Sequence, residues 1–104
     1  MNTNQILPVA VFGFNRPGKL ARVLNALRPQ KIDRLIIFID GPRTERDSPH
    51  VHACRDLAKK VDWTRTDLYF HKSNHGLTGI QENITTVLQD YPKAVFVEDD
   101  CLLS

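Results

Sequence analysis

Three consecutive carboxylates, Glu98, Asp99 and Asp100, follow the apolar run Ala94–Val97. Neighbouring carboxylates repel one another, and beside a buried strand they need water or a cation. Mg²⁺ and Mn²⁺ are held by one or two carboxylates, with phosphate oxygens and water in the other positions. In extended backbone Glu98 and Asp100 point to the same side, so both could face one ligand. The alternative is a solvated acidic turn at the end of a strand.

Three further polar segments also follow apolar runs. Arg16, next to Asn15, offers a planar fork of donors at the start of a predicted helix, which suits a diphosphate. Asp40 can accept a hydrogen bond from a sugar hydroxyl or from the imide N–H of a uracil-type base. Gly76, within the segment 74–79, allows close backbone approach or a positive φ. The plainer interpretations are a surface arginine beside a capping asparagine, an Asx-turn, and an ordinary connection between a strand and a helix.

The apolar runs before these segments are short and rich in Val, Ile and Phe. They do not alternate with polar residues, which is typical of strands covered on both faces of a parallel sheet. The runs are Val9–Phe14, Leu35–Ile39, Leu68–Phe70 and Ala94–Val97. We therefore expect about four strands.

Helical periodicity lies between the runs. The predicted helices begin at Pro17, at Ser48 and near Thr78, where Gln81 completes a capping box, and the last helix stops before Pro92. Their predicted buried faces are Leu20, Val23, Leu24 and Leu27; Val51, Cys54, Leu57, Ala58 and Val61; and Ile80, Ile84, Val87 and Leu88. Alternating strands and helices predict an α/β, Rossmann-like, mostly parallel sheet with helices on both faces.

In such sheets ligands bind outside the carboxyl ends of the strands, where the strand order changes direction. All four polar segments stand at those ends, and this convergence is the main functional indication in the sequence.

Composition excludes several classes of protein. The 104 residues are 25% charged and 41% hydrophobic, which fits one globular domain. A transmembrane helix needs about 20 apolar residues, and the longest unbroken run is Leu35–Ile39. Nucleic acid is not expected, because 14 basic and 12 acidic residues are nearly balanced and form no basic block. Two distant cysteines, Cys54 and Cys101, predict buried thiols in a reducing, cytoplasmic setting.

A second hypothesis comes from the segment Gly13–Lys19, which matches the phosphate-loop pattern G-x-x-x-x-G-K between a strand and a helix. Leu20 stands where that motif needs a hydroxyl for Mg²⁺, and Pro17 removes an N–H from a loop that works by donating such groups. A phosphate-loop nucleotide hydrolase is therefore the weaker alternative. A non-catalytic module that binds a nucleotide or a partner is a third.

Four segments stand in order along nearly the whole chain, namely Val9–Pro17, Leu35–Gly41, Asn74–Leu77 and Val95–Asp100. In that order they resemble the N-terminal, nucleotide-binding half of a GT-A-fold glycosyltransferase, above all the N-acetylglucosaminyltransferase I-like group and its bacterial sugar-transferase relatives. Glu98 stands where the family's D-x-D-type motif more commonly has Asp, which agrees with the E-D-D version of the subgroup.

The resemblance implies a metal-dependent transfer of a sugar from a nucleotide diphosphate-sugar, such as a UDP-sugar, to a hydroxyl of a saccharide or glycoconjugate. Arg16 would lie against the nucleotide and Asp40 would contact the base. Asp100 would bind Mn²⁺ or Mg²⁺, Asp99 would meet the ribose, and Glu98 would lie nearer the donor sugar.

The family's acceptor-binding half and its catalytic base follow this motif, whereas this chain ends at Ser104. We expect residues 1–104 to form one donor-binding domain, a partial GT-A fold without a complete catalytic apparatus. Apolar surface that would contact the other half should make the chain marginally stable and prone to self-association. The expected location is the cytoplasm, including the inner face of the membrane.

Overall fold

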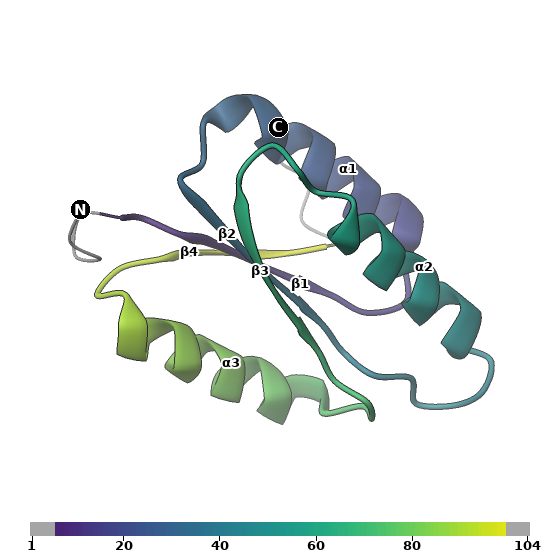
Figure 1. Cartoon of the computed structure of the whole chain (residues 1–104). Coiled ribbons are helices and arrows are strands. Elements are labelled where there is room, and N and C mark those ends of the chain that lie inside the picture. Colours follow the sequence, from purple (N-terminus) through teal and green to yellow (C-terminus); the bar gives the residue numbers. More distant parts are fainter. Residues whose placement is uncertain (1–5, 100–104) are drawn as a thin grey trace.

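Four strands and three α-helices alternate along residues 6–99, the part of the chain that this computed structural model describes (Figure 1). The strands are β1 (Val9–Gly13), β2 (Arg34–Ile39), β3 (Arg65–Phe70) and β4 (Val95–Glu98). The helices are α1 (Pro17–Leu27), α2 (Ser48–Lys59) and α3 (Gly76–Asp90), and a short 3₁₀ helix (Arg28–Gln30) follows α1. The predicted α/β, Rossmann-like fold is confirmed.

Every strand pairing in this sheet is parallel, and the strand order is β3-β2-β1-β4. The chain moves outward from β1 to β2 and β3, and then returns to place β4 on the other side of β1. The strand order therefore reverses between β1 and β4. The carboxyl ends of these two strands flank the position where open α/β sheets bind ligands.

Helices cover both faces of the sheet (Figure 1). On one face α1 and α2 pack against alternate strand residues, and the completely buried side chains there include Leu20, Leu35 and Ile37. On the other face, Val87 of α3 and Tyr91, which follows this helix, are buried against the sheet. The two layers follow from the β period of two, because neighbouring residues of a buried strand point to opposite faces.

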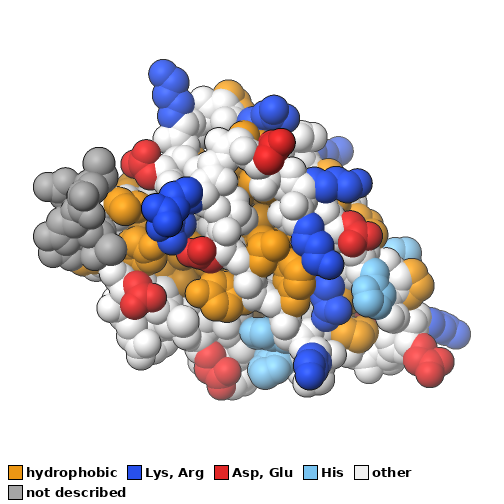
Figure 2. Space-filling model, in the orientation of Figure 1, with side chains coloured by type: hydrophobic (Ala, Val, Ile, Leu, Met, Phe, Trp, Pro, Cys, Tyr) orange, Lys and Arg blue, Asp and Glu red, His pale blue; other side chains and the backbone are white. Residues whose placement is uncertain are grey.

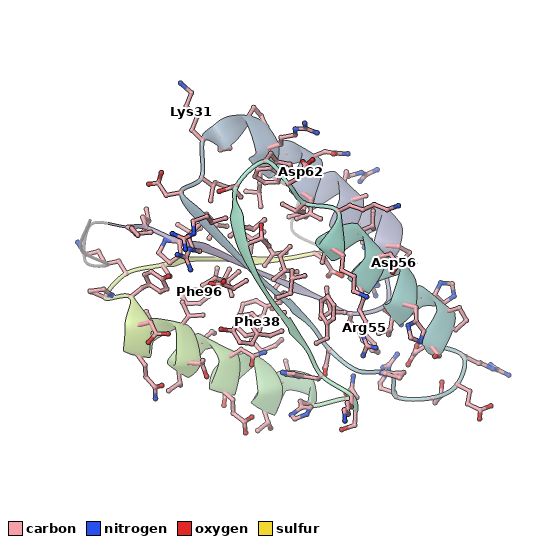
Figure 3. The ribbon with its side chains drawn as sticks, in the orientation of Figure 1. Lys31, Phe38, Arg55, Asp56, Asp62 and Phe96 are labelled. Atoms are coloured by element: carbon pink, nitrogen blue, oxygen red, sulfur yellow. The ribbon has the colours of Figure 1, made fainter. Side chains whose placement is uncertain are left out.

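A row of aromatic rings crosses the face under α3. Phe12 of β1 stacks on Phe38 of β2 with centroids 5.3 Å apart, and on Phe96 of β4 at 6.1 Å. Phe38 in turn stacks on Tyr69 of β3 at 4.9 Å. Figure 3 shows Phe38 and Phe96 on the side of the sheet that faces α3. These rings join all four strands, and two of them, Phe12 and Phe38, lie next to the carboxyl edge.

The edge strand β3 departs most from the sequence-based expectation. It begins at Arg65 rather than Leu68, because Arg65 pairs with Arg34 of β2 although the first three residues are not an apolar run. The expectation that β3 is covered on both faces is wrong, since Leu68 and Tyr69 are 37% and 43% exposed. Figure 2, in the orientation of Figure 1, shows hydrophobic and basic side chains intermingled on the face of the molecule that is turned toward the viewer.

The predicted start of α3 is also wrong. The helix begins at Gly76, and the preceding His75 makes no side-chain cap, so the expected capping box of Thr78 and Gln81 is not formed. Leu88, predicted to be buried, is 44% exposed, because α3 turns mainly Val87 toward the sheet. Among the described residues, no helix is both long enough and apolar enough to cross a membrane.

Candidate functional site

A cavity of about 440 Å³ opens at the carboxyl edge of the sheet. Its lining includes every described residue of the predicted site, namely Asn15, Arg16, Asp40, Gly76, Glu98 and Asp99. The predicted metal ligand Asp100 lies outside the described residues. The remaining lining residues are Phe12, Gly13, Phe14, Phe38, Arg43, His71, Asn74, Leu77, Gly79, Ile80, Asn83. The expected convergence of the strand ends is thus present for all the residues whose positions are described.

Asp40, the residue after β2, is held by backbone N–H groups. Its Oδ1 accepts hydrogen bonds from the N–H of Gly41 and of His75, both at 2.9 Å. Its Oδ2 accepts one from the N–H of Gly76 at 3.0 Å. The expected Asx-turn is not formed, because it needs the N–H two residues on and Pro42 has none. The carboxylate instead supplies the cap that α3 lacks from its own sequence. A contact between Asp40 and a nucleobase stays a prediction.

Two glycines allow this junction to form. Gly76 has a φ of +61°, a left-handed conformation that glycine adopts without strain. At Gly41 an added Cβ would lie only 2.5–2.6 Å from the backbone of Ser73, so no larger residue fits without movement. Asn74 donates from Nδ2 to the carbonyl of Gly41 at 3.0 Å. The loops after β2 and β3 are consequently joined into one wall of the cavity.

A second junction joins the loops after β1 and β2 through Asp47, which is only 8% exposed. Asn15 donates from Nδ2 to Oδ1 of Asp47 at 2.9 Å, and the backbone N–H of Arg43 donates to Oδ2 at 3.0 Å. The hydrogen bond from Asn15, together with those from Arg43, holds the pKa of Asp47 below its ordinary value of 3.8, against the opposing effect of burial. Sequence reasoning missed Asp47 and Arg43. Neither follows a strand directly, and the only signal was an acidic residue just before the predicted helix at Ser48.

Arg16 precedes α1 as its N-cap residue, and its carbonyl accepts the N–H of Leu20 at 3.0 Å. The side chain is exposed at the cavity, and no group within residues 6–99 accepts a hydrogen bond from its guanidinium. Its donors are therefore available to a ligand.

The acidic end of β4 lies directly beside the end of β1. Glu98 is the last residue of β4 and pairs in register with Phe12, while the N–H of Asp99 donates to the carbonyl of Phe12 at 3.0 Å. Within residues 6–99 no three His, Cys, Asp or Glu side chains gather as a metal site. The predicted set of carboxylates includes Asp100, which those residues do not contain.

Cys54 of α2 is completely buried near this edge. Burial raises the pKa of its thiol to about 11, and the charge of Asp99 adds to this, while a backbone hydrogen bond from Arg16 opposes it. The prediction of a buried thiol is confirmed for Cys54. Cys101 lies outside the described residues.

The phosphate-loop pattern does not form a phosphate loop. Gly13 ends β1 and Pro17 begins α1, so Gly18 and Lys19 already belong to the first helical turn. Leu20, at the position that needs a hydroxyl, is completely buried in the core. This segment therefore lacks the metal-binding hydroxyl and, at Pro17, one of the N–H donors that phosphate-loop enzymes use.

The chain matches no known protein-family profile, no curated protein and no solved structure. Its function is therefore inferred from the site. The cavity combines two arginines, a carboxylate-bearing strand end and an aromatic floor at the strand-order reversal. Such a combination suits a ligand that is anionic in one part and flat or apolar in another.

Proposed function

We propose that this chain is the donor-binding half of a metal-dependent glycosyltransferase that uses a nucleotide diphosphate-sugar such as a UDP-sugar. One observation carries the proposal. Residues from the ends of β1, β2 and β4 and from the start of α3 line a single cavity where the strand order reverses. Open α/β sheets bind nucleotides at that position. Each of the four segments that carry the resemblance to GT-A-fold enzymes contributes residues to the lining of this cavity.

The proposal assigns the diphosphate, the ribose and the donor sugar to different parts of the cavity. The guanidinium of Arg16 has no acceptor within residues 6–99, so it can donate to diphosphate oxygens, which a planar fork binds in pairs. Asp99 and Glu98 would face the ribose and the donor sugar, because carboxylates accept hydrogen bonds from hydroxyl groups. Gly76, at the α3 end of the cavity, lets the backbone approach the ligand closely.

The acidic end of β4 fits a hard divalent cation in its donor chemistry. Its side chains are all carboxylates, the ligands that Mg²⁺ and Mn²⁺ prefer. Asp100 would hold the ion, with Glu98 and Asp99 next to it in the chain. When bound, the ion would offset the negative charge that grows on the diphosphate as it leaves the sugar. We assign no catalytic base to the described residues.

The proposal includes a saccharide or glycoconjugate acceptor and a cytoplasmic setting, where nucleotide sugars could reach the site. It also includes self-association through the apolar side chains that β3 exposes, Leu68 and Tyr69. Sedimentation at increasing concentration tests this last part, and a persistent monomer would contradict it.

Calorimetry with UDP and Mn²⁺, compared with ATP and Mg²⁺, tests the main proposal. We expect UDP to bind only with Mn²⁺, and Asp100→Ala to abolish that binding. Asp62→Ala is the matched control, because Asp62 is an exposed acid that does not line the cavity. Preference for ATP with Mg²⁺ would favour the phosphate-loop hydrolase, and no binding of either nucleotide would favour the non-catalytic module. UDP binding that is unchanged in Asp100→Ala would falsify the metal assignment.

A further inference from the structure

Arg43 is a second arginine at the cavity, and it lies in the loop between β2 and α2. Its guanidinium carbon lies 5.0 Å from the centroid of the Phe14 ring. Its Nε lies 3.4 Å from Oδ2 of Asp47. No group within residues 6–99 accepts a hydrogen bond from its two terminal nitrogens, and the side chain is 63% exposed. The outer edge of the guanidinium is therefore open to a ligand.

The inner edge of the same guanidinium is held in place. Asp47 is nearly buried, and it accepts hydrogen bonds from the backbone and the side chain of Arg43 as well as from Asn15. The Phe14 ring lies against the guanidinium, at a distance that allows a cation–π interaction. An arginine that is oriented by such contacts loses less side-chain entropy when it binds an anion than a free surface arginine does.

The order of the strands gives the cavity a charge gradient. Arg43 follows β2, Arg16 follows β1, and Glu98 and Asp99 end β4, and these strands are neighbours in the order β2-β1-β4. On the side of β2 and β1, the carboxylates of Asp40 and Asp47 are hydrogen-bonded by N–H groups. Arg16 and Arg43 on that side keep donors that no group within residues 6–99 accepts, whereas Glu98 and Asp99 stand on the other side of the strand-order reversal. A doubly or triply charged anion is attracted to the first side and repelled from the second unless a metal ion is present.

We infer that Arg43 is a second cation for a pyrophosphoryl group, acting together with Arg16, and that Asp47 is the positioning residue that orients Arg43. That the pyrophosphoryl group belongs to a nucleotide rests on the proposed function. That Arg43 binds a pyrophosphoryl group does not. Inorganic pyrophosphate is therefore a probe that separates the two.

Calorimetry of the full chain with Mn²⁺ and inorganic pyrophosphate, UDP or uridine tests the inference. We expect Arg43→Gln to lower the affinity for pyrophosphate and for UDP about tenfold, because charge-assisted hydrogen bonds are lost. The affinity for uridine should not change. Arg43→Lys should restore only part of the affinity, because a lysine keeps the charge without the planar fork. Arg46→Gln is the matched control, since Arg46 is an exposed arginine of the same loop that does not line the cavity.

A double-mutant cycle tests the role of Asp47. Asp47→Asn should weaken pyrophosphate in the native sequence and have no further effect in the Arg43→Gln background. If Asp47→Asn weakens pyrophosphate equally in both backgrounds, its effect does not pass through Arg43, and the positioning role is overturned.

The outcomes separate the inference from the proposed function. If Arg43→Gln binds pyrophosphate as tightly as the native chain, or if Arg46→Gln weakens it equally, the inference fails even where UDP binds. If the binding of pyrophosphate depends on Arg43 but the chain binds UDP no more tightly than pyrophosphate, the inference stands and the proposed function fails. If the native chain binds neither compound, both fail.

Discussion

The carboxylate of Asp40 supports the wall of the cavity, so its removal should loosen the junction between β2 and α3. Three backbone N–H groups depend on it, those of Gly41, His75 and Gly76, at 2.9–3.0 Å. Asp40→Ala leaves all three without their acceptor. Asp40→Asn keeps one oxygen but turns an N–H₂ group toward at least one of these donors.

The size of the effect can be worked out from these contacts. A hydrogen bond to a charged group contributes about 1.5–3 kcal/mol, and the loss of a helix cap costs about 0.5–2 kcal/mol. The Asp40 side chain is 20% exposed and His75 lies at the surface, so water replaces part of what is lost. We therefore take about 1 kcal/mol for each bond, which gives a loss of about 3 kcal/mol for Asp40→Ala. Asp40→Asn should cost about half of that, because one acceptor oxygen remains.

Urea denaturation followed by circular dichroism measures this loss. With an m value of about 2 kcal/mol/M, the midpoint of Asp40→Ala should fall by about 1.5 M. Asp62→Ala serves as the control, because Asp62 is exposed and accepts no hydrogen bond within the described residues. Hydrogen exchange should also quicken at the amides of His75 and Gly76. If Asp40→Ala unfolds at the same urea concentration as Asp62→Ala, Asp40 does not support this junction.

Three other predictions follow from single contacts. Cys54 should react with a disulfide reagent at pH 8 only as fast as the chain unfolds, because the thiol is buried and burial raises its pKa to about 11. The measurement uses a chain with Cys101 replaced by Ser, and fast reaction under native conditions would contradict the prediction. The fold holds the pKa of Asp47 below its ordinary value of 3.8, so the native chain should lose stability as the pH falls through that region. The stability of Asp47→Asn should depend less on pH, and parallel pH profiles of the two chains in urea melts at pH 5, 4 and 3 would exclude this contribution. Gly41→Ala should destabilise the chain by about 2 kcal/mol, because its Cβ would lie 2.5–2.6 Å from the backbone of Ser73. Gly18→Ala is the control, since its Cβ would meet nothing within 4 Å, and this change in α1 should be neutral or stabilising by up to about 1 kcal/mol. Equal urea midpoints for the two variants would contradict the packing argument.

Most of the fold could be predicted from the sequence, because hydrophobic periodicity is a local property. The buried strands and the apolar stripe of α1 were found from runs and spacings alone, and Leu20, Val23, Leu24 and Leu27 are all buried. The errors lie at the two edge strands, where Leu68 and Tyr69 of β3 and Val95 of β4 are exposed, and in α3, at its start and at Leu88. An edge strand buries little, so its polar residues resemble a loop, and α3 is capped by a residue far away in the chain.

The candidate site was predicted in its position but not in its internal contacts. Asn15, Arg16, Asp40, Glu98 and Asp99 come together because parallel strands end at a common edge. The residues that orient these side chains, such as Asp47, were not predicted. Neither the type of a residue nor its spacing in the sequence indicates that an aspartate will be buried.

The linear order of residues decided which segments become strands and helices and which polar side chains stand at the strand ends. These properties depend on neighbours within one or two turns of backbone. The fold alone decided that β4 returns beside β1, that Asp40 caps α3 and that Asp47 joins Asn15 to Arg43. The partners in the contacts of Asp40 with Gly76 and of Asn15 with Asp47 are 36 and 32 residues apart. Such hydrogen bonds form only after the sheet has brought separate loops to one edge, so no local pattern can record them.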